Sequence, residues 1–240
     1  PVVPTCHYMM GGTPTNVNGQ AFRRTNGNDS IISGFFAAGE AACVSVHGAN
    51  RLGGNSLLDL VVFGRATGMH IQEELKSGGG VESSSKGDID ASLERLNKLN
   101  ESTSGYETAS VKRELQECMQ NYFGVFRRGD FMEKGLNELA EIRHKVDNLH
   151  LKDKSSAFNT SRVEAIELQN LFEVAEATAI SAFERNESRG AHARDDFPER
   201  DDENWLCHSF YDPINKKVSK REVNFAPTKV DAFPPIVRTY

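Results

Sequence analysis

The sequence predicts an α/β domain remnant that another chain or segment completes, followed by a helical bundle domain and a small, irregular α+β C-terminal domain. Three observations lead to this order. Residues 1–76 hold a strand-like run, a glycine-rich turn and an apolar helix, whereas helical periodicity dominates residues 88–185. Between them, residues 77–87 are rich in Gly and Ser, as flexible linkers are. In residues 186–240, charges crowd between aromatic residues and prolines, which indicates a short, partly β structure.

The composition is that of a mildly acidic globular chain. With 240 residues, of which 38% are hydrophobic, the chain is long enough to bury a core, and its net charge is −6. We expect no nucleic-acid partner, because the basic pairs at residues 23–24 and 127–128 are too short to form a patch. No stretch approaches the roughly 18 apolar residues that a membrane span needs, so any membrane association is expected to be indirect.

Four cysteines are scattered along the chain without paired spacing: Cys6, Cys43, Cys118 and Cys207. Zinc sites and disulfide frameworks are recognised by close, repeated cysteine spacings, which this pattern does not show. We therefore expect no metal site, no disulfide framework and a reducing compartment.

The first element is expected at residues 31–40, where a short apolar run, predicted to be a buried strand, is closed by Gly39 and Glu40. An acidic side chain at the end of such a strand is a common acceptor for ribose or ribityl hydroxyls. Glu40 is therefore a candidate hydroxyl acceptor.

The next element is a glycine-rich turn before an apolar helix. Arg51 is charged at every working pH and presents paired donors that suit a carboxylate, while Gly53 and Gly54 let the backbone approach a ligand closely. Asn55 or Ser56 is expected to cap the helix, so that free amides and the positive dipole end face the ligand. A phosphate, a carboxylate or an electron-rich ring suits such a site. The alternative is an ordinary turn and a core helix, with Arg51 on the surface.

Beyond the linker, apolar residues recur at helical spacing and predict a bundle of three or four helices. Asp88 is a candidate N-cap for the first of them, and the last is expected from about residue 162 to residue 183. The residues predicted to face the core are Ile89, Leu93, Leu96, Leu99, Val111, Leu115, Met119, Leu136, Leu139, Ile142, Val146, Val163, Ile166, Leu171, Val174 and Ala177.

Several blocks of sequence carry a resemblance to a known family. They are HYMMGG at residues 7–12, GANRLGGNSLLD at 48–59, QECMQ at 116–120, ESRGAH at 187–192, RDDENW at 200–205, FPP at 233–235 and RTY at 238–240. Together they resemble the flavoprotein subunit of succinate dehydrogenase (complex II), and more loosely its relatives fumarate reductase and L-aspartate oxidase. The resemblance spans essentially the whole chain, but only about two-fifths of a subunit of that family.

The sequence contains no G-x-G-x-x-G, although this family opens its flavin domain with that turn. The resemblance therefore implies that residues 1–76 are the C-terminal part of an FAD-binding domain. It also places three features outside this chain: the histidine that carries FAD covalently, most of the capping domain, and the arginine that carries the catalytic proton. The chain by itself is expected to be inert.

The resemblance implies oxidation of succinate to fumarate in the tricarboxylic acid cycle, with electrons passing through FAD to an iron-sulfur subunit and on to quinone. FAD would be shared with the N-terminal flavoprotein portion, and membrane-anchor subunits would be indirect partners. The expected location is peripheral, on the matrix side of the mitochondrial inner membrane or the cytoplasmic face of a bacterial inner membrane.

The same resemblance assigns the site residues. His7 and Arg51 are expected to bind the carboxylates of the substrate, and Arg51 is the catalytic clamp of this chain. His47 is expected to pack behind the site as a supporting residue. The residues expected to contact FAD are Glu40, Asn55, Ser56 and Leu57, with Ser56 and Leu57 acting mainly through backbone amides.

A charged cluster near the C-terminus has a composition that also suits catalysis. We interpret it instead as a network of ion pairs that holds the last domain to the flavin domain and to the iron-sulfur subunit. Its members are Arg189, His192, Arg194, Asp195, Asp196, Glu199, Asp201, Asp202 and Glu203. The remaining histidines His70, His144 and His150 are expected to face solvent.

Two classes of function stay open. In the first, the chain is half of a catalytic flavoprotein whose other half is a separate polypeptide, through a split gene or through cleavage. In the second, it is a truncation product, retained for assembly or without function. The unaltered Arg51 and the neighbouring glycines favour the first. A fumarate reductase or an L-aspartate oxidase as the parent enzyme is a further alternative.

Overall fold

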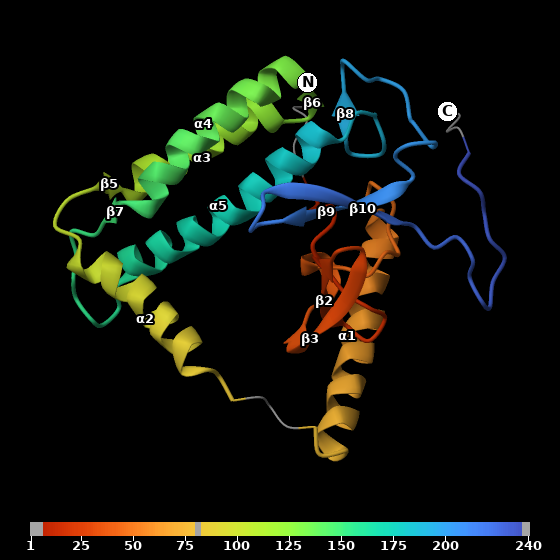
Figure 1. The fold of residues 1–240 in the computed structure, drawn as a ribbon, viewed down its shortest axis with the longest axis horizontal. Helices are drawn as coiled ribbons and strands as arrows, with labels where there is room; N and C mark the ends of the chain where they lie inside the picture. The colour runs from red at the N-terminus through yellow and green to blue at the C-terminus, as the bar shows by residue number, and fades with distance from the viewer. Residues whose placement is uncertain (1–6, 80–82, 237–240) are drawn as a thin grey trace.

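The computed structural model describes residues 7–79 and 83–236. An α/β part around α1 and a helical bundle lie on either side of a C-terminal β-hairpin (Figure 1). The strands are β1 (Thr13–Pro14), β2 (Gln20–Thr25), β3 (Asn28–Phe36), β4 (Ala42–Cys43), β5 (Tyr106–Glu107), β6 (Phe126–Arg127), β7 (Leu149–His150), β8 (Ala193–Arg194), β9 (Cys207–Asp212) and β10 (Lys217–Glu222). The helices are the 3-10 turn η1 (Gly39–Ala41) and α1 (Gly53–Lys76), α2 (Lys86–Glu101), α3 (Thr108–Phe123), α4 (Gly129–Asp147) and α5 (Thr160–Glu184).

Strands β2 and β3 form an antiparallel hairpin. It contacts α1, because Gln20 donates to Glu74 at 3.0 Å and the Phe36 ring lies 6.3 Å from that of His70. Asn26 and Gly27 turn the chain with φ angles of 51° and 83°, the left-handed conformation that a two-residue hairpin turn requires. Gly19 lies so close to Thr67 of α1 that a Cβ at this position would clash with it. The hairpin is thereby fixed against the middle of the helix.

The strand predicted within residues 31–40 exists as β3, but it ends at Phe36 and is not buried. Ile31 and Phe35 are 49% and 48% exposed. A two-stranded sheet packed on one helix covers a single face, and the described residues leave the other face open. The expectation of a buried strand is therefore wrong for this chain.

Helix α1 is apolar around most of its circumference, yet much of it is exposed. Leu57, Leu58, Leu60, Val61 and Val62 are between 47% and 69% exposed. Such a helix is typical of a buried position, and burying each of these side chains is worth about 1.5–3 kcal/mol. The predicted core helix is present, but the described residues do not supply its core. Among them, no helix combines the length and apolarity needed to cross a membrane.

Helices α3, α4 and α5 pack around one apolar core. The predicted phases of α3 and α4 are confirmed, because Val111, Leu115, Leu139, Ile142 and Val146 are all buried. The buried core consists of Leu99, Val111, Leu115, Cys118, Phe123, Met132, Leu139, Ile142, Val146, Leu149, Leu151, Ala165, Leu168, Phe172, Ala175, Ala179 and Ala182.

The predicted inward face of α5 is confirmed only in part, because Ile166 packs against the core but three other predicted residues do not. Val163, Leu171 and Val174 are 54%, 42% and 48% exposed. The prediction followed the largest side chains, but small residues allow α3 and α4 to approach α5 more closely. The side chains that face the core are Ala165, Leu168, Phe172, Ala175, Ala179 and Ala182.

Helix α2 begins at Lys86, so the last two residues of the predicted linker are helical, and residues 80–82 lie outside the described part. Asp88 is not the N-cap. Ser85 is, because its hydroxyl accepts from the Asp88 N–H at 3.1 Å and donates to the Asp88 carboxylate at 2.6 Å, a reciprocal capping arrangement. Of the predicted core residues of α2, Leu99 is buried, whereas Ile89 and Leu93 are about half exposed.

The antiparallel hairpin of β9 and β10 contacts both other parts of the chain, as its position in Figure 1 shows. Phe210 of β9 stacks on Phe22 of β2 with ring centroids 6.0 Å apart. On its other side, Tyr211 donates to Glu176 of α5 at 3.0 Å. The C-terminal segment therefore ties the helical bundle to the α/β part.

Candidate functional site

The segment of residues 7–12 runs beside η1. The Met9 N–H donates to the Glu40 carboxylate at 2.7 Å. Gly12 has a φ of 129°, and a Cβ there would lie 2.7 Å from the carbonyl oxygen of Ala41. Glycine is therefore required at this position for close approach, and Thr13 continues directly into the parallel pairing of β1 with β4.

The same segment reaches the start of α1. The Arg51 N–H donates to the Met10 sulfur at 3.1 Å, and the Tyr8 hydroxyl lies next to Gly53. His7 is exposed, and its ring packs edge-on against Tyr8 at 4.7 Å between centroids. The described contacts bring the neighbourhoods of His7, Glu40 and Arg51 together, but include no direct hydrogen bond between His7 and Arg51.

Arg51 is buried, with 4% exposure, so the alternative of a surface arginine is wrong. Its Nε donates to the Ser56 hydroxyl at 2.8 Å, and its Nη2 donates to Asp59 Oδ2 at 2.6 Å. The guanidinium has five N–H donors, and these bonds use two of them. Among the described residues no partner is found for Nη1, so this edge can bind an anion.

Asp59 is a residue that the sequence reasoning missed. It is 4% exposed, and its Oδ2 accepts from both Arg51 and the Nε2 of His47, the latter at 3.1 Å. His47 thus lies behind Arg51, as expected. The available signal was spacing: Ser56 and Asp59 are three residues apart, so a helix presents them on one face toward the preceding arginine.

Helix α1 starts earlier than predicted. Its first residue is Gly53 and its N-cap is Leu52, which makes no side-chain capping bond. Asn55 and Ser56 as caps are therefore wrong, because the glycine pair itself adopts helical conformation. The Ser56 N–H already donates to the Leu52 carbonyl at 2.8 Å, so it is not a free amide. Leu57 lies one residue further into the helix.

The unsatisfied amides of α1 are those of its first turn, at Gly53, Gly54 and Asn55. They point out of the positive end of a 24-residue helix that has no acidic residue in its first turn. The Arg51 guanidinium lies beside Ser56 and Asp59 of the same helix, with its charge paired to Asp59 and its Nη1 donors unused among the described residues. This combination can bind an anion or the electron-rich edge of a ring.

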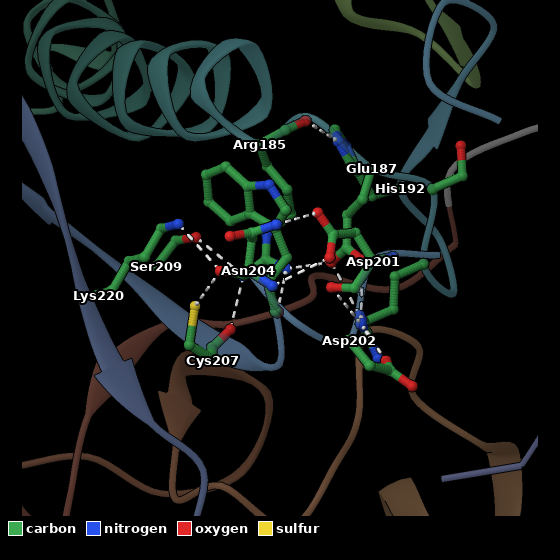
Figure 2. A network of polar contacts seen from close by, with 12 residues as sticks. Arg185, Glu187, His192, Asp201, Asp202, Asn204, Cys207, Ser209 and Lys220 are labelled. Atoms are coloured by element: carbon green, nitrogen blue, oxygen red, sulfur yellow. Dashed lines mark hydrogen bonds and ion pairs between the residues drawn. The ribbon is translucent and has the colours of Figure 1, made fainter. Parts of the chain in front are cut away.

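The C-terminal network centres on Glu187, which is fully buried (Figure 2). Its carboxylate accepts from Arg185, from the Arg189 Nε at 2.8 Å and from the Asp201 N–H at 2.9 Å. Burial alone raises the pKa of Glu187, but these bonds from Arg189, Asp201 and Arg185 outweigh it, so the pKa lies below its ordinary value. Glu187 was not among the predicted members, although Arg185, Glu187 and Arg189 alternate in charge at two-residue spacing.

The rest of this network fixes the turn that follows Glu187. Arg189 pairs with Asp202 at 2.6 Å. His192 is held between Arg127, at 2.8 Å, and the carbonyl of Arg185, at 3.0 Å, and burial lowers its pKa to about 4. Neutral His192 donates through Nε2 and accepts through Nδ1, which is a structural and not a catalytic arrangement.

Among the described residues, this network contacts the α/β part through its backbone, while Arg221 of β10 forms an ion pair with Asp29 of β3 at 3.1 Å. The Ala191 N–H donates to the Ala49 carbonyl at 2.9 Å. Gly190, with a φ of 59°, packs so tightly on Ala49 that a Cβ would lie 2.6 Å from the Ala49 carbonyl carbon. The predicted cluster stabilises the C-terminal segment and also holds it to the helical bundle, because Asp196 accepts from the Gly129 N–H at 2.9 Å and Arg194 donates to the Phe183 carbonyl at 3.0 Å. The backbone contact with Ala49 places this segment two residues from Arg51.

Other candidate residues have structural surroundings. His144 is exposed as expected, whereas His70 and His150 are half-buried, against Phe36 and Ser102, so solvent exposure is wrong for these two. The described cysteines, at residues 43, 118 and 207, are free, and Cys6 lies outside the described part. No cluster of three or more His, Cys, Asp or Glu side chains suited to a metal ion is found within residues 7–79 and 83–236.

Residues 112–240 match the family described as fumarate reductase flavoprotein C-term, and residues 1–57 match the FAD binding domain. The expectation that the cofactor is FAD is thereby confirmed.

Similar proteins agree with these matches. The chain is 51% identical over 236 residues to the succinate dehydrogenase flavoprotein subunit of Coxiella burnetii, covering 98% of this chain and 40% of the relative. It is 42% identical to the mitochondrial succinate dehydrogenase [ubiquinone] flavoprotein subunit of Oryza sativa, covering 100% of this chain and 39% of the relative. Quinol fumarate reductase from E. coli superposes with a TM-score of 0.81 at 36% identity, covering 98% of this chain and 39% of that one.

The chain therefore spans about two-fifths of the length of the relatives it matches. The resemblance of its sequence blocks is confirmed along essentially its full length. This chain belongs to the succinate dehydrogenase and fumarate reductase flavoprotein family.

Proposed function

We propose that this chain is the C-terminal portion of a succinate dehydrogenase flavoprotein and supplies dicarboxylate-binding groups for the oxidation of succinate to fumarate. One observation carries the proposal. Arg51 is a buried guanidinium whose Nη1 edge is left over after its bonds to Ser56 and Asp59, and it stands beside the uncapped start of α1. A buried cation with spare donors is a strong binding group for a carboxylate.

In this proposal, Arg51 and His7 bind the substrate. Arg51 takes one carboxylate through Nη1, and His7, on the segment anchored to Glu40 and Arg51, donates to the other. Holding the diacid at both ends fixes its central bond, an effect worth several kcal/mol of barrier in well-oriented reactions, up to about 7–11 kcal/mol. Arg51 is the catalytic residue of this chain, because it is expected to contact the reacting substrate. The arginine that takes the proton is expected in the N-terminal portion.

The same end of the chain fits FAD. The uncapped first turn of α1 offers amide donors at Gly53, Gly54 and Asn55, and Ser56 and Leu57 follow directly. Glu40 keeps one carboxylate oxygen beyond its bond to Met9 and is placed to accept hydroxyl groups. When bound, FAD supplies the two-electron acceptor for the substrate. The positive helix end favours the negative charge that reduction brings.

The remaining half of the FAD site is proposed to come from an N-terminal flavoprotein portion. The exposed apolar face of α1 and the open face of β3 support an N-terminal partner, because both carry the apolar side chains typical of surfaces that are buried in a core. That portion is either a separate polypeptide or a preceding segment of the same one. Further proposed partners are an iron-sulfur subunit that receives the electrons and membrane-anchor subunits that bind quinone. The complex would lie peripherally at a mitochondrial or bacterial inner membrane.

Fumarate reduction is the second candidate function. It is favoured by the superposition on a quinol fumarate reductase and by the family description of residues 112–240. The two directions use the same dicarboxylate site, and the reduction potentials of flavin, clusters and quinone decide between them. Rates of succinate oxidation and fumarate reduction, measured with the same assembled complex, separate the two candidates.

The experiment that tests the proposal is Arg51→Ala in the assembled complex. We expect succinate turnover to fall about a thousandfold or more, because a charge-assisted carboxylate contact is lost, while FAD content stays unchanged. Turnover is measured with a dye acceptor, and FAD by absorbance per complex. Arg113→Ala, an exposed arginine of α3, is the matched control and should leave both unchanged. Loss of FAD with normal turnover per remaining flavin would contradict the assignment of Arg51.

A further inference from the structure

Asp59 has more contacts with the proposed site than a surface carboxylate of α1 would have. Its side chain is 2% exposed, and Oδ2 accepts from Arg51 Nη2 at 2.6 Å and from His47 Nε2 at 3.1 Å. Because a carboxylate only accepts, the His47 ring must donate through Nε2. The three side chains form one chain of contacts that runs from the loop before α1 to the guanidinium.

The geometry fixes Arg51 at two points. Ser56 holds Nε at 2.8 Å, and Asp59 holds Nη2 from the next turn of the same helix. Two bonds on one edge of a planar group, together with its covalent attachment at Cδ, restrict the direction of the opposite edge. Nη1, the group expected to meet a substrate carboxylate, is therefore aimed by Ser56 and Asp59.

A purely structural ion pair is the alternative, and one observation argues against it. Asp59 Oδ1 is buried and has no hydrogen-bond partner among the described residues. Burying a carboxylate with one unpaired oxygen is unfavourable, so stability alone does not explain an aspartate here. The contact with Arg51 explains the aspartate instead, because its carboxylate orients the guanidinium.

We propose that Asp59 is a positioning residue for dicarboxylate binding, and that His47 positions Asp59. Asp59 sets the direction of the Arg51 guanidinium, and His47 holds the carboxylate from the opposite side. Neither touches the substrate, and both act through Arg51. The inference rests on the proposed role of Arg51 as the carboxylate-binding group.

The test uses the assembled complex with Asp59→Asn, which keeps the size of the side chain and removes its charge. The probe is malonate, a three-carbon dicarboxylate that cannot be oxidised at a central bond, titrated by the change in flavin absorbance. We expect the malonate Kd and the succinate KM to rise about tenfold or more, with FAD content unchanged. Asp90→Asn, an exposed aspartate of α2, is the matched control and should leave all three unchanged.

A double-mutant cycle separates positioning from a merely structural role. In an Arg51→Lys background, Asp59→Asn should change the malonate Kd by less than about twofold, because the group it aims is already gone. An equal, additive effect in both backgrounds would overturn the inference. His47→Phe removes the ring donor and leaves the carboxylate in place, so it tests the same inference even if Asp59→Asn does not assemble. A raised malonate Kd in His47→Phe supports the inference, and an unchanged one overturns it.

The result for Arg51→Ala distinguishes a failure of the positioning role from a failure of the proposed function. If Arg51→Ala loses malonate binding while Asp59→Asn and His47→Phe retain it, the positioning inference fails and the proposed function stands. If Arg51→Ala itself binds malonate normally, the proposed function fails.

Discussion

Arg51 is a buried guanidinium that uses only part of its donor capacity inside its own chain. The sequence around Arg51 predicts an anion-binding role for it, because glycines and a permanently charged side chain occur together before an apolar helix. The sequence did not predict Asp59 as its partner, since the pairing depends on where the first helical turn begins. A start at Gly53 places Ser56 and Asp59 on the face toward Arg51. The sequence therefore suggests Arg51 as a candidate but does not give the orientation of its side chain.

Glu187 is a second single residue whose replacement is expected to change the stability of the protein measurably. Replacing it with glutamine leaves Arg185 and Arg189 facing a neutral amide in a buried site. We expect the free energy of unfolding to fall by about 3–5 kcal/mol, the usual cost of breaking a buried ion pair. Thermal unfolding of the flavoprotein at pH 7 measures it, with the exposed Glu164→Gln of α5 as control. Equal melting temperatures for the two variants would contradict the role of Glu187 as the stabilising centre of the network.

The pH dependence of this network has a definite sign. The pKa of Glu187 lies below its ordinary value of 4.5, so the folded protein releases this proton more readily than the unfolded chain. The stabilisation is therefore fully present above about pH 4.5 and is lost as the pH falls through the folded pKa. Hydrogen bonds from Arg189 likewise lower the pKa of Asp202, so it acts in the same direction. The melting temperature of Glu187→Gln should depend less on pH below 4.5 than that of the unaltered protein.

At the scale of elements, the helical periodicity of apolar residues predicts the buried face of a helix correctly where one apolar face packs against one core. It gave α3 and α4 in the correct phase. For α5 it placed Ile166 correctly but missed most of the buried face, where small residues such as Ala165 and Ala179 lie beside Phe172. The number of apolar atoms on a face does not reveal how closely a neighbouring helix approaches. The two cap predictions failed for different reasons. Leu52, which is not a preferred capping residue, precedes α1, whereas Ser85 caps α2 as well as an aspartate would and lies three residues before Asp88.

Helix α1 offers a prediction about assembly. Val61 is 69% exposed in this chain, on a face that we assign to contact with the N-terminal flavoprotein portion. Val61→Glu in the complete flavoprotein would bury an unpaired charge at that contact, so we expect FAD incorporation to fall at least tenfold. Flavin absorbance per purified flavoprotein measures this. Ile214→Glu, at an 85% exposed position in the turn between β9 and β10, is the matched control. Normal FAD incorporation in Val61→Glu would show that this face of α1 stays open to solvent.

At the scale of the whole molecule, the C-terminal hairpin connects two parts that have few other described contacts (Figure 1). Phe210 stacks on Phe22, and Tyr211 bonds to Glu176 of α5. The sequence divides into three parts because composition and periodicity change along the chain. It could not predict that the last part bridges the other two, because such packing depends on contacts between residues far apart in the sequence.

The central claim is that Arg51 and His7 of this chain hold a dicarboxylate beside FAD. The most direct test is an experimental structure of the assembled complex with FAD and malonate bound. We expect Arg51 Nη1 and the His7 ring each to lie within about 2.7–3.2 Å of a malonate oxygen, with Asp59 still bonded to Arg51 Nη2. Malonate bound near FAD by other residues, with Arg51 and His7 both out of reach, would contradict it.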